Sequence, residues 1–490
     1  MSKKNQAANK EADRTASNSL GEQAGQFFEH TRQNLKRAFQ NRHCIGITGL
    51  SRSGKSTLIC SLINQLRQFQ TASLGGFSPV VGKRLLSVQV HPLEDTGLAE
   101  FPYADAIDAL SSDPPQWPSP TTDISGCLLE LKLQQDSSIK QLLGAEARSV
   151  FLELRDYPGE WLLDLPMMQI DYVGWCAQSS RLFTNSPRLE LMGDLLDELQ
   201  QIDPLSPYDE ASCQRLRQAY VAFLKRCKGG EHSLSLVQPG RFLLPGRFRN
   251  DPILDFVPLL GCSTLSEELL KSAPQDSYFK VFEQRYRDYV TQIVQPFYQQ
   301  QFRPITRQVV LIDLVNALNG GSAYIDDMRQ AIAQISESFH YGRNNPLRKL
   351  FSPQVEELAF VATKMDQVVA GNHEAVRQLL GQLVSDAYSQ AAHRGAVPRI
   401  EAIAAIRASR EVVEQGRAAL SGYDLAGNPV GYVHPTIPDR LGDEAGFTPF
   451  RDWKIPAFQP PVHGDFHHQA IPHIRLDSLL ELVTRGCRYE

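Results

Sequence analysis

Cysteine is scarce in this chain, and the few cysteines are scattered. The 490 residues include eight cysteines, none of them in a Cys-x-x-Cys pair, so we expect reduced, small hydrophobic side chains in a cytoplasmic protein. No apolar run approaches the length of about 20 residues that crosses a bilayer, so any membrane contact is expected to be peripheral or made through a partner. The opening stretch, MSKKNQAANKEADRTASNS, lacks the apolar core of a signal peptide.

A dense stripe of basic charge is also missing. Lys and Arg number 50 against 55 Asp and Glu, which gives a formal net charge of −5, and no aromatic-glycine RNA-binding motif stands out. We therefore expect no nucleic-acid partner. With 42% hydrophobic and 21% charged residues, the composition is that of an ordinary soluble protein, and the length allows two or three domains with a large core.

The stretch GLSRSGKST, residues 49–57, matches the phosphate-loop pattern G-x-x-x-x-G-K-[ST] at every fixed position. A short β-branched run at 44–48 precedes it, and apolar residues with helical spacing follow it over 58–68. Strand, loop and helix therefore come in the order that phosphate binding requires, with Lys55 as a mobile cation and the Ser56 hydroxyl as a Mg²⁺ ligand. The loop residues expected to bind nucleotide are Gly49, Ser51, Arg52, Ser53, Gly54, Lys55, Ser56 and Thr57.

A second motif, Asp156-Tyr157-Pro158-Gly159, follows the apolar run 149–154. Asp156 at the end of a strand is the carboxylate expected beside Mg²⁺, and the N–H of Gly159 is expected to meet a γ-phosphate, as in the D-x-x-G switch of GTP-binding proteins. The first switch should add a hydroxyl to the metal, and Thr121 is the candidate, with Thr122 as the alternative.

A third motif selects the base. Thr363-Lys364-Met365-Asp366 follows the apolar run 358–362 and is similar to the [NT]-K-x-D element of GTPases. One carboxylate accepts hydrogen bonds from both the ring N–H and the exocyclic amine of guanine, whereas adenine offers no such donor pair, so guanine is favoured. The loop 407–409 after the next apolar run is expected to touch guanine through backbone N–H groups, with Arg407, Ala408 and Ser409 as the candidates.

The order of apolar runs predicts the fold class. Runs at 85–90, 127–133, 149–154, 308–314, 358–362 and 400–406, mostly separated by helical or loop segments, predict a doubly wound, mostly parallel sheet. We expect a disordered tail over 1–19, the first part of the nucleotide-binding domain over 20–159, and its second part over 306–410. Residues 160–305 are expected to form a helical insertion lobe, and 411–490, rich in Gly, Pro and His, an irregular extension.

On GLSRSGKST, DYPGEW and TKMD, their wide spacing and the long insertion, the chain resembles the YcjX-like family of stress-associated bacterial P-loop GTPases, and more distantly the Ras-like proteins. The resemblance implies GTP or GDP with Mg²⁺, GTP hydrolysis in the cytoplasm and an association with stress, but it names no effector. Two positions depart from the Ras pattern: Thr363 stands where Asn is usual, and Glu160 where Gln is usual. Because a carboxylate cannot orient water as an amide does, Glu160 leads us to expect slow turnover.

The loop also resembles that of guanylate-binding proteins, which implies that Arg52 acts as a built-in arginine finger. The motifs themselves place Lys55, Thr121 and Gly159 at the same expected catalytic site. An Arg52 side chain in solvent or paired with a carboxylate remains the alternative. Two other functions stay open at this point. They are an ATP-dependent P-loop enzyme such as a kinase, and a scaffold that binds nucleotide without hydrolysing it.

Overall fold

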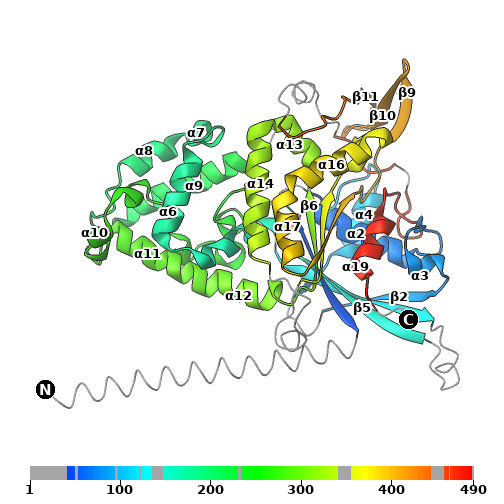
Figure 1. Cartoon of the computed structure of the whole chain (residues 1–490), viewed down its shortest axis with the longest axis horizontal. Helices are drawn as coiled ribbons and strands as arrows, with labels where there is room; N and C mark the ends of the chain where they lie inside the picture. Colours follow the sequence, from blue (N-terminus) through cyan, green and yellow to red (C-terminus); the bar gives the residue numbers. More distant parts are fainter. Residues whose placement is uncertain are drawn as a thin grey trace, which may run out of the picture.

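The computed structural model describes most of the chain, namely residues 41–49, 53–93, 98–120, 123–134, 147–229, 233–339, 355–442, 457–462 and 464–487. A mostly parallel sheet lies beside a long segment made of helices (Figure 1). This confirms the predicted mixed α/β class with a mostly parallel central sheet.

Every apolar run predicted to be a strand overlaps one in the structure. Among the described residues the main sheet has the order β2-β4-β5-β1-β6-β7-β8, and β3 pairs with β4. Its strands are β1 (Arg42–Gly49), β2 (Leu85–His91), β3 (Ala99–Glu100), β4 (Ser125–Gln134), β5 (Ala147–Asp156), β6 (Arg307–Ile312), β7 (Glu357–Ala362) and β8 (Val397–Ala402).

The strand order reverses at β1. The strands that follow β1 directly in the chain lie on its β5 side, and the later strands β6, β7 and β8 lie on its other side. Strands β5, β1, β6, β7 and β8 are parallel, so their carboxyl ends share one edge, whereas β4 runs antiparallel to both β2 and β5. In open α/β sheets, ligands bind outside the carboxyl ends of the strands at such a reversal point.

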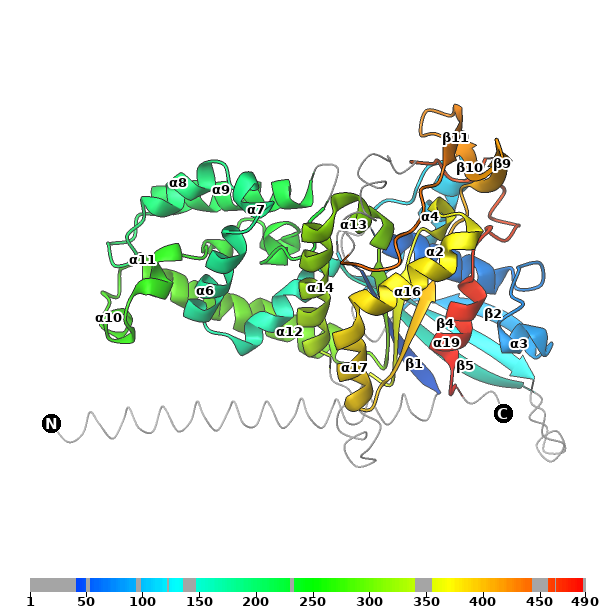
Figure 2. The same cartoon turned by 45° about the horizontal axis from the view of Figure 1, so that its top comes forward.

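Alternate residues of the central strands contribute to two cores, one on each face of the sheet. On β6, Val309 and Leu311 belong to the core built with α2 (Lys55–Arg67), α4 (Tyr103–Ser111) and α19 (Leu476–Thr484). Val310 and Ile312 belong to the opposite core, which includes α14 (Ser322–Glu337), α16 (His373–Leu383) and α17 (Ser385–His393) (Figures 1 and 2). Successive side chains of a strand point to opposite faces, so a strand covered on both faces is apolar throughout.

Between β5 and β6 the described residues form helices joined by loops, with no strand. We call residues 159–302 the helical segment. Its buried side chains form one continuous cluster with the sheet face that carries Val310 and Ile312. Its elements are η2 (Gly159–Gln169), α6 (Tyr172–Phe183), α7 (Arg188–Leu191), α8 (Asp194–Gln200), α9 (Glu210–Lys228), η3 (Gly240–Phe242), η4 (Gly246–Phe248), η5 (Pro252–Leu254), η6 (Leu260–Thr264), α10 (Glu267–Lys271), α11 (Tyr278–Tyr289), η7 (Val290–Val294), α12 (Gln295–Phe297) and η8 (Tyr298–Phe302).

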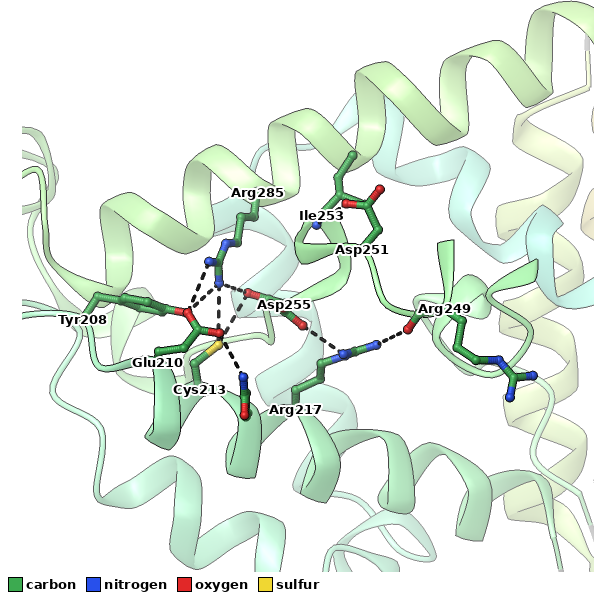
Figure 3. A network of polar contacts seen from close by, with 10 residues as sticks. Tyr208, Glu210, Cys213, Arg217, Arg249, Asp251, Ile253, Asp255 and Arg285 are labelled. Carbon is green, nitrogen blue, oxygen red and sulfur yellow. Dashed lines mark hydrogen bonds and ion pairs between the residues drawn. The ribbon is translucent and has the colours of Figure 1, made fainter. Parts of the chain in front are cut away.

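A polar network inside the helical segment joins α9, α11 and the turn after η5 (Figure 3). Arg285 of α11 donates to the Tyr208 hydroxyl at 2.9 Å and to the Asp255 carbonyl at 2.7 Å. Arg217 of α9 pairs with the Asp255 carboxylate at 3.0 Å. Because one aspartate is bound from both helices, the network fixes the orientation of α9, whose carboxyl end points back to the sheet.

The remaining helices complete the layers on both faces of the sheet. Within the described residues, none of the helices combines the length and the apolar character needed to cross a membrane. The remaining elements are α3 (Ser78–Val81), α13 (Leu314–Gly320), η9 (Met365–Gln367) and η10 (Ala370–Asn372).

The expectation of an irregular chain after residue 410 was wrong for part of this region. Residues 410–433 form a three-stranded antiparallel sheet of β9 (Arg410–Glu414), β10 (Arg417–Tyr423) and β11 (Pro429–Val433), and α19 follows later. The first hairpin turns at Gln415 and Gly416, which both have positive φ (49° and 77°), the conformation that a two-residue hairpin loop requires. Composition alone hid this alternation of short strands and tight turns.

Candidate functional site

The phosphate loop begins where β1 ends and stops where α2 begins. Gly54 has φ 84°, a left-handed conformation that costs glycine little, and α2 starts at the next residue, Lys55. Within the described residues no side-chain hydrogen bond caps this helix, and the amides of a helix's first turn point to where an anion would bind. Thr57 lies in the same first turn.

Two fixed positions of the phosphate-loop pattern, the first glycine and the lysine, lie against the second motif. The Lys55 ammonium donates to the carbonyl of Gly49 at 3.3 Å. A side chain on Gly159 would place its Cβ 1.9 Å from that same carbonyl oxygen and 3.5 Å from Lys55 Nζ. A side chain on Gly49 would likewise lie 1.9 Å from the Oγ of buried Ser53. Gly159 is therefore required by the close approach of the Gly49 backbone, and Gly49 by the side chains of Ser53 and Leu311.

Two side-chain oxygens that could bind a metal ion lie beside this contact. Ser56 Oγ donates to Asp156 Oδ2 at 3.5 Å, and Asp156 is 1% exposed at the carboxyl end of β5. The parallel register places Asp156 beside Ile47 of β1, two residues before the phosphate loop. A hydroxyl and a carboxylate are hard oxygen ligands of the kind that Mg²⁺ takes together with phosphate oxygens, so these residues fit the expected metal.

Glu160, the residue after Gly159, forms an ion pair with the helical segment. Its Oε1 lies 3.5 Å from Nζ of Lys228, the last residue of α9. Burial acts to raise the pKa of Glu160, but the positive charges of Lys228 and Lys55 outweigh it and lower that pKa, so the carboxylate is charged. The helical segment thus contributes a cation to the end of the site where Lys55 and Gly159 meet, which is the predicted phosphate end.

The segment after the second motif is bound tightly to the helical segment. The Asp164 carboxylate accepts hydrogen bonds from the Gly240 N–H at 2.7 Å and from the Tyr289 hydroxyl at 2.6 Å. A Cβ on Gly240 would lie 1.9 Å from the carbonyl oxygen of Glu160, so the two backbones touch. Trp161 Nε1 donates to the Leu244 carbonyl at 3.0 Å. The residues that follow Gly159 are therefore bound directly to the helical segment.

The third motif, predicted to select the base, forms the other end of the site. Asp366 lies 8% exposed in η9, and its Oδ2 accepts the Ala408 N–H at 3.3 Å. The Ser409 hydroxyl donates to the Asp366 carbonyl, so the two predicted base-binding loops are joined. Burial raises the pKa of Asp366 to about 6, against the opposing effect of the Ala408 N–H. Arg407 belongs to the same loop, and its N–H donates to the Pro472 carbonyl at 2.7 Å.

Lys364 has a partner that the sequence did not indicate. Its Nζ lies 2.6 Å from Asp313 Oδ2, a carboxylate just after β6. Lys364 adopts φ 59°, which is unusual for a residue with a side chain and occurs mainly where the surroundings impose it. Thr363 precedes it, and its N–H donates to the Ile312 carbonyl at 3.0 Å. The motif is thereby bound to the end of the neighbouring strand.

Four predicted residues lie outside the described part of the chain: Ser51, Arg52, Thr121 and its alternative Thr122. Their roles stay predictions.

The chain is similar to known proteins over most of its length. The family described as "YcjX-like family, DUF463" matches residues 44–485. A protein of Escherichia coli (strain K12) named "Ras-like GTPase YcjX" is 36% identical over 450 residues, which cover 90% of this chain and 95% of that protein. A protein of the same name from Shewanella oneidensis (strain MR-1) is 34% identical over 474 residues, which cover 92% of this chain and 96% of that protein. The chain belongs to the YcjX-like family.

Sequence reasoning missed three site residues of this YcjX-like chain. Asp313 had a weak signal, because a carboxylate directly after a buried strand lies at the same edge as the phosphate loop. Lys228 and Gly240 had none: a lysine at a helix end is favoured by the helix dipole alone, and Gly240 lies far from every motif in the sequence.

Proposed function

We propose that this YcjX-like protein binds GTP with Mg²⁺ and hydrolyses it slowly, as a switch between triphosphate and diphosphate states. The observation that carries the proposal is the meeting of Lys55, Ser56, Asp156 and Gly159 at the carboxyl edge of the sheet. The names of the two relatives support the same activity. The association with stress rests on the family resemblance.

Each residue has a distinct role in this proposal. Lys55 and the first amides of α2 neutralise the phosphates, and Ser56 and Asp156 hold Mg²⁺, which would offset the charge that develops during transfer. The N–H of Gly159 contacts the γ-phosphate, so loss of that phosphate releases the second motif. Asp366 accepts the two donors of guanine, and the Ala408 loop supports it.

A second candidate, a nucleotide-binding scaffold without turnover, is favoured by one observation. Glu160 stands where an amide would orient water, and its carboxylate faces Lys228. An ATP-dependent enzyme such as a kinase is disfavoured by the buried Asp366, because adenine lacks the donor pair that this carboxylate would accept.

The test begins with the protein as purified. We expect mass spectrometry to identify a copurifying guanine nucleotide, and titration of stripped protein to show GTP and GDP bound far more tightly than ATP. Phosphate release from saturating GTP should require Mg²⁺ and stop in Lys55→Met. Preference for ATP would overturn the proposed specificity, and tight GTP binding without phosphate release would establish the scaffold.

A further inference from the structure

Lys228 ends α9 with its ammonium buried against the phosphate end of the site. Its side chain and that of Glu160 are each 12% exposed, and the two charges lie 3.5 Å apart. Burial is the main cause that lowers the pKa of Lys228, and the positive charge of Lys55 lowers it further. Two lysines therefore face one glutamate at the position where the second motif meets the phosphate loop.

The last turn of α9 contains two other basic residues, and neither lies like Lys228. Lys225 is exposed, and Arg226 donates to the carbonyls of Leu191 and Met192 at 2.7 and 2.6 Å. Basic residues at a helix end are expected from the helix dipole, which explains exposed charges there. The dipole does not explain why an ammonium is buried against a second cation.

The chain around Lys228 is held in place. Leu234 N–H donates to the carbonyl of buried Cys227 at 2.9 Å. The buried Asp327 carboxylate of α14 accepts the N–H groups of Ser235 and Leu236 at 2.5 and 3.2 Å. These contacts, together with the network of Figure 3, fix both ends of α9, so the ammonium of Lys228 is preorganised rather than a mobile surface charge.

We propose that Lys228 binds the γ-phosphate of the triphosphate and thereby reports the nucleotide state to the helical segment. The inference rests on the proposed function. Glu160 follows the switch glycine directly, which puts Lys228 at the γ-phosphate rather than at the base. A γ-phosphate here attracts both ammonium groups and repels the carboxylate, so it competes with Glu160 for Lys228. After the γ-phosphate leaves, Glu160 is again the partner of Lys228.

The experiment compares affinities for GDP and for a GTP analogue with an imido group between the β- and γ-phosphates, measured by calorimetry with Mg²⁺. Lys228→Met keeps the apolar stem and removes only the ammonium. We expect the affinity for the analogue to fall at least about tenfold, the loss of one charged hydrogen bond, while GDP affinity changes less than about twofold. Lys228→Arg should retain the preference, and Lys225→Met, at the exposed position, should match the unaltered protein for both nucleotides.

Glu160→Gln supplies a second readout that does not depend on the folding of the Lys228 variant. Without the competing carboxylate, the affinity for the GTP analogue should rise and the affinity for GDP should stay unchanged. An unaltered analogue-to-GDP ratio in Lys228→Met, or equal loss of both nucleotides, overturns this inference alone when the unaltered protein binds GTP in a Lys55-dependent way. Failure of the unaltered protein to bind GTP overturns the proposed function and this inference with it.

Discussion

At the phosphate end of the site, charged side chains arrive from the phosphate loop, the second motif and the helical segment. At the base end, one buried carboxylate is held by the backbone of the next loop. Lys55, Glu160 and Lys228 interact as charges, whereas Asp366 and Ala408 are joined by a directed hydrogen bond. Phosphates carry charge and bind to cations from several directions, but a base is recognised by the direction of its donors. The first end can therefore couple to distant helices, and the second is built for selectivity.

Removing the phosphate-loop cation should have the largest effect, because it should weaken phosphate binding and leave base recognition intact. We expect Lys55→Met to weaken GTP and GDP about a hundredfold, or about 3 kcal/mol, because the phosphates lose a charged hydrogen bond. The preference for guanine over hypoxanthine should survive, since the base end is unchanged. Calorimetric titration checks this, with Lys271→Met on the exposed α10 as the control. Unchanged GTP affinity would exclude the phosphate-loop assignment.

A methyl group on the switch glycine should damage the phosphate end through the backbone. Its Cβ would lie 1.9 Å from the Gly49 carbonyl oxygen, which cannot move without the loop. We expect Gly159→Ala to lower the free energy of unfolding by about 2–3 kcal/mol, the cost of overpacking. Gly371→Ala is the control, because a Cβ there meets nothing within 4 Å. Equal chemical denaturation curves for the two variants would contradict the close approach.

Altering the base end should change the selectivity for the base and leave phosphate binding unchanged. Asp366→Asn replaces an acceptor oxygen with an amide NH₂ that faces the donors of guanine. The affinity for GTP should therefore fall about thirtyfold, or about 2 kcal/mol. Xanthosine triphosphate should bind more tightly, because its carbonyl can accept from the new amide. Competition titration measures both, with the exposed Asp386→Asn as the control. Equal loss for both bases would count against base selection by Asp366.

The pH dependence of GTP affinity should arise from the Asp366 carboxylate at the base end. Burial raises the pKa of Asp366 from 3.8 to about 6, so this carboxylate becomes protonated in the nucleotide-free protein as the pH falls through 6. GTP binding needs the ionised carboxylate. Between pH 7 and pH 5, the GTP affinity of the unaltered protein should therefore fall about tenfold more than the GTP affinity of Asp366→Asn. The folded pKa lies above the ordinary value, so ionised Asp366 costs stability above about pH 6, and nucleotide-free Asp366→Asn should unfold at a higher temperature. A parallel pH profile in the two proteins would exclude this carboxylate as the source.

The sequence by itself determined the parallel sheet and the motifs that follow its strands. Continuous apolar runs make strands that are buried on both faces, and the residues after parallel strands meet at one edge. This is why Lys55, Asp156 and Asp366 could be placed in advance. The same reasoning failed after residue 410, because composition rich in Gly and Pro concealed a hairpin whose turn at Gln415 and Gly416 is set by backbone dihedrals.

Only the tertiary structure decided which cations and carboxylates face those motifs. Lys228 lies 68 positions beyond Glu160 in the sequence, and Lys364 lies 51 beyond Asp313, so no local pattern pairs them. Their contacts depend on how α9 packs and on which strands are neighbours. A motif is local because consecutive backbone groups form it, whereas a charge pair between distant residues exists only once the chain has folded and buried both groups.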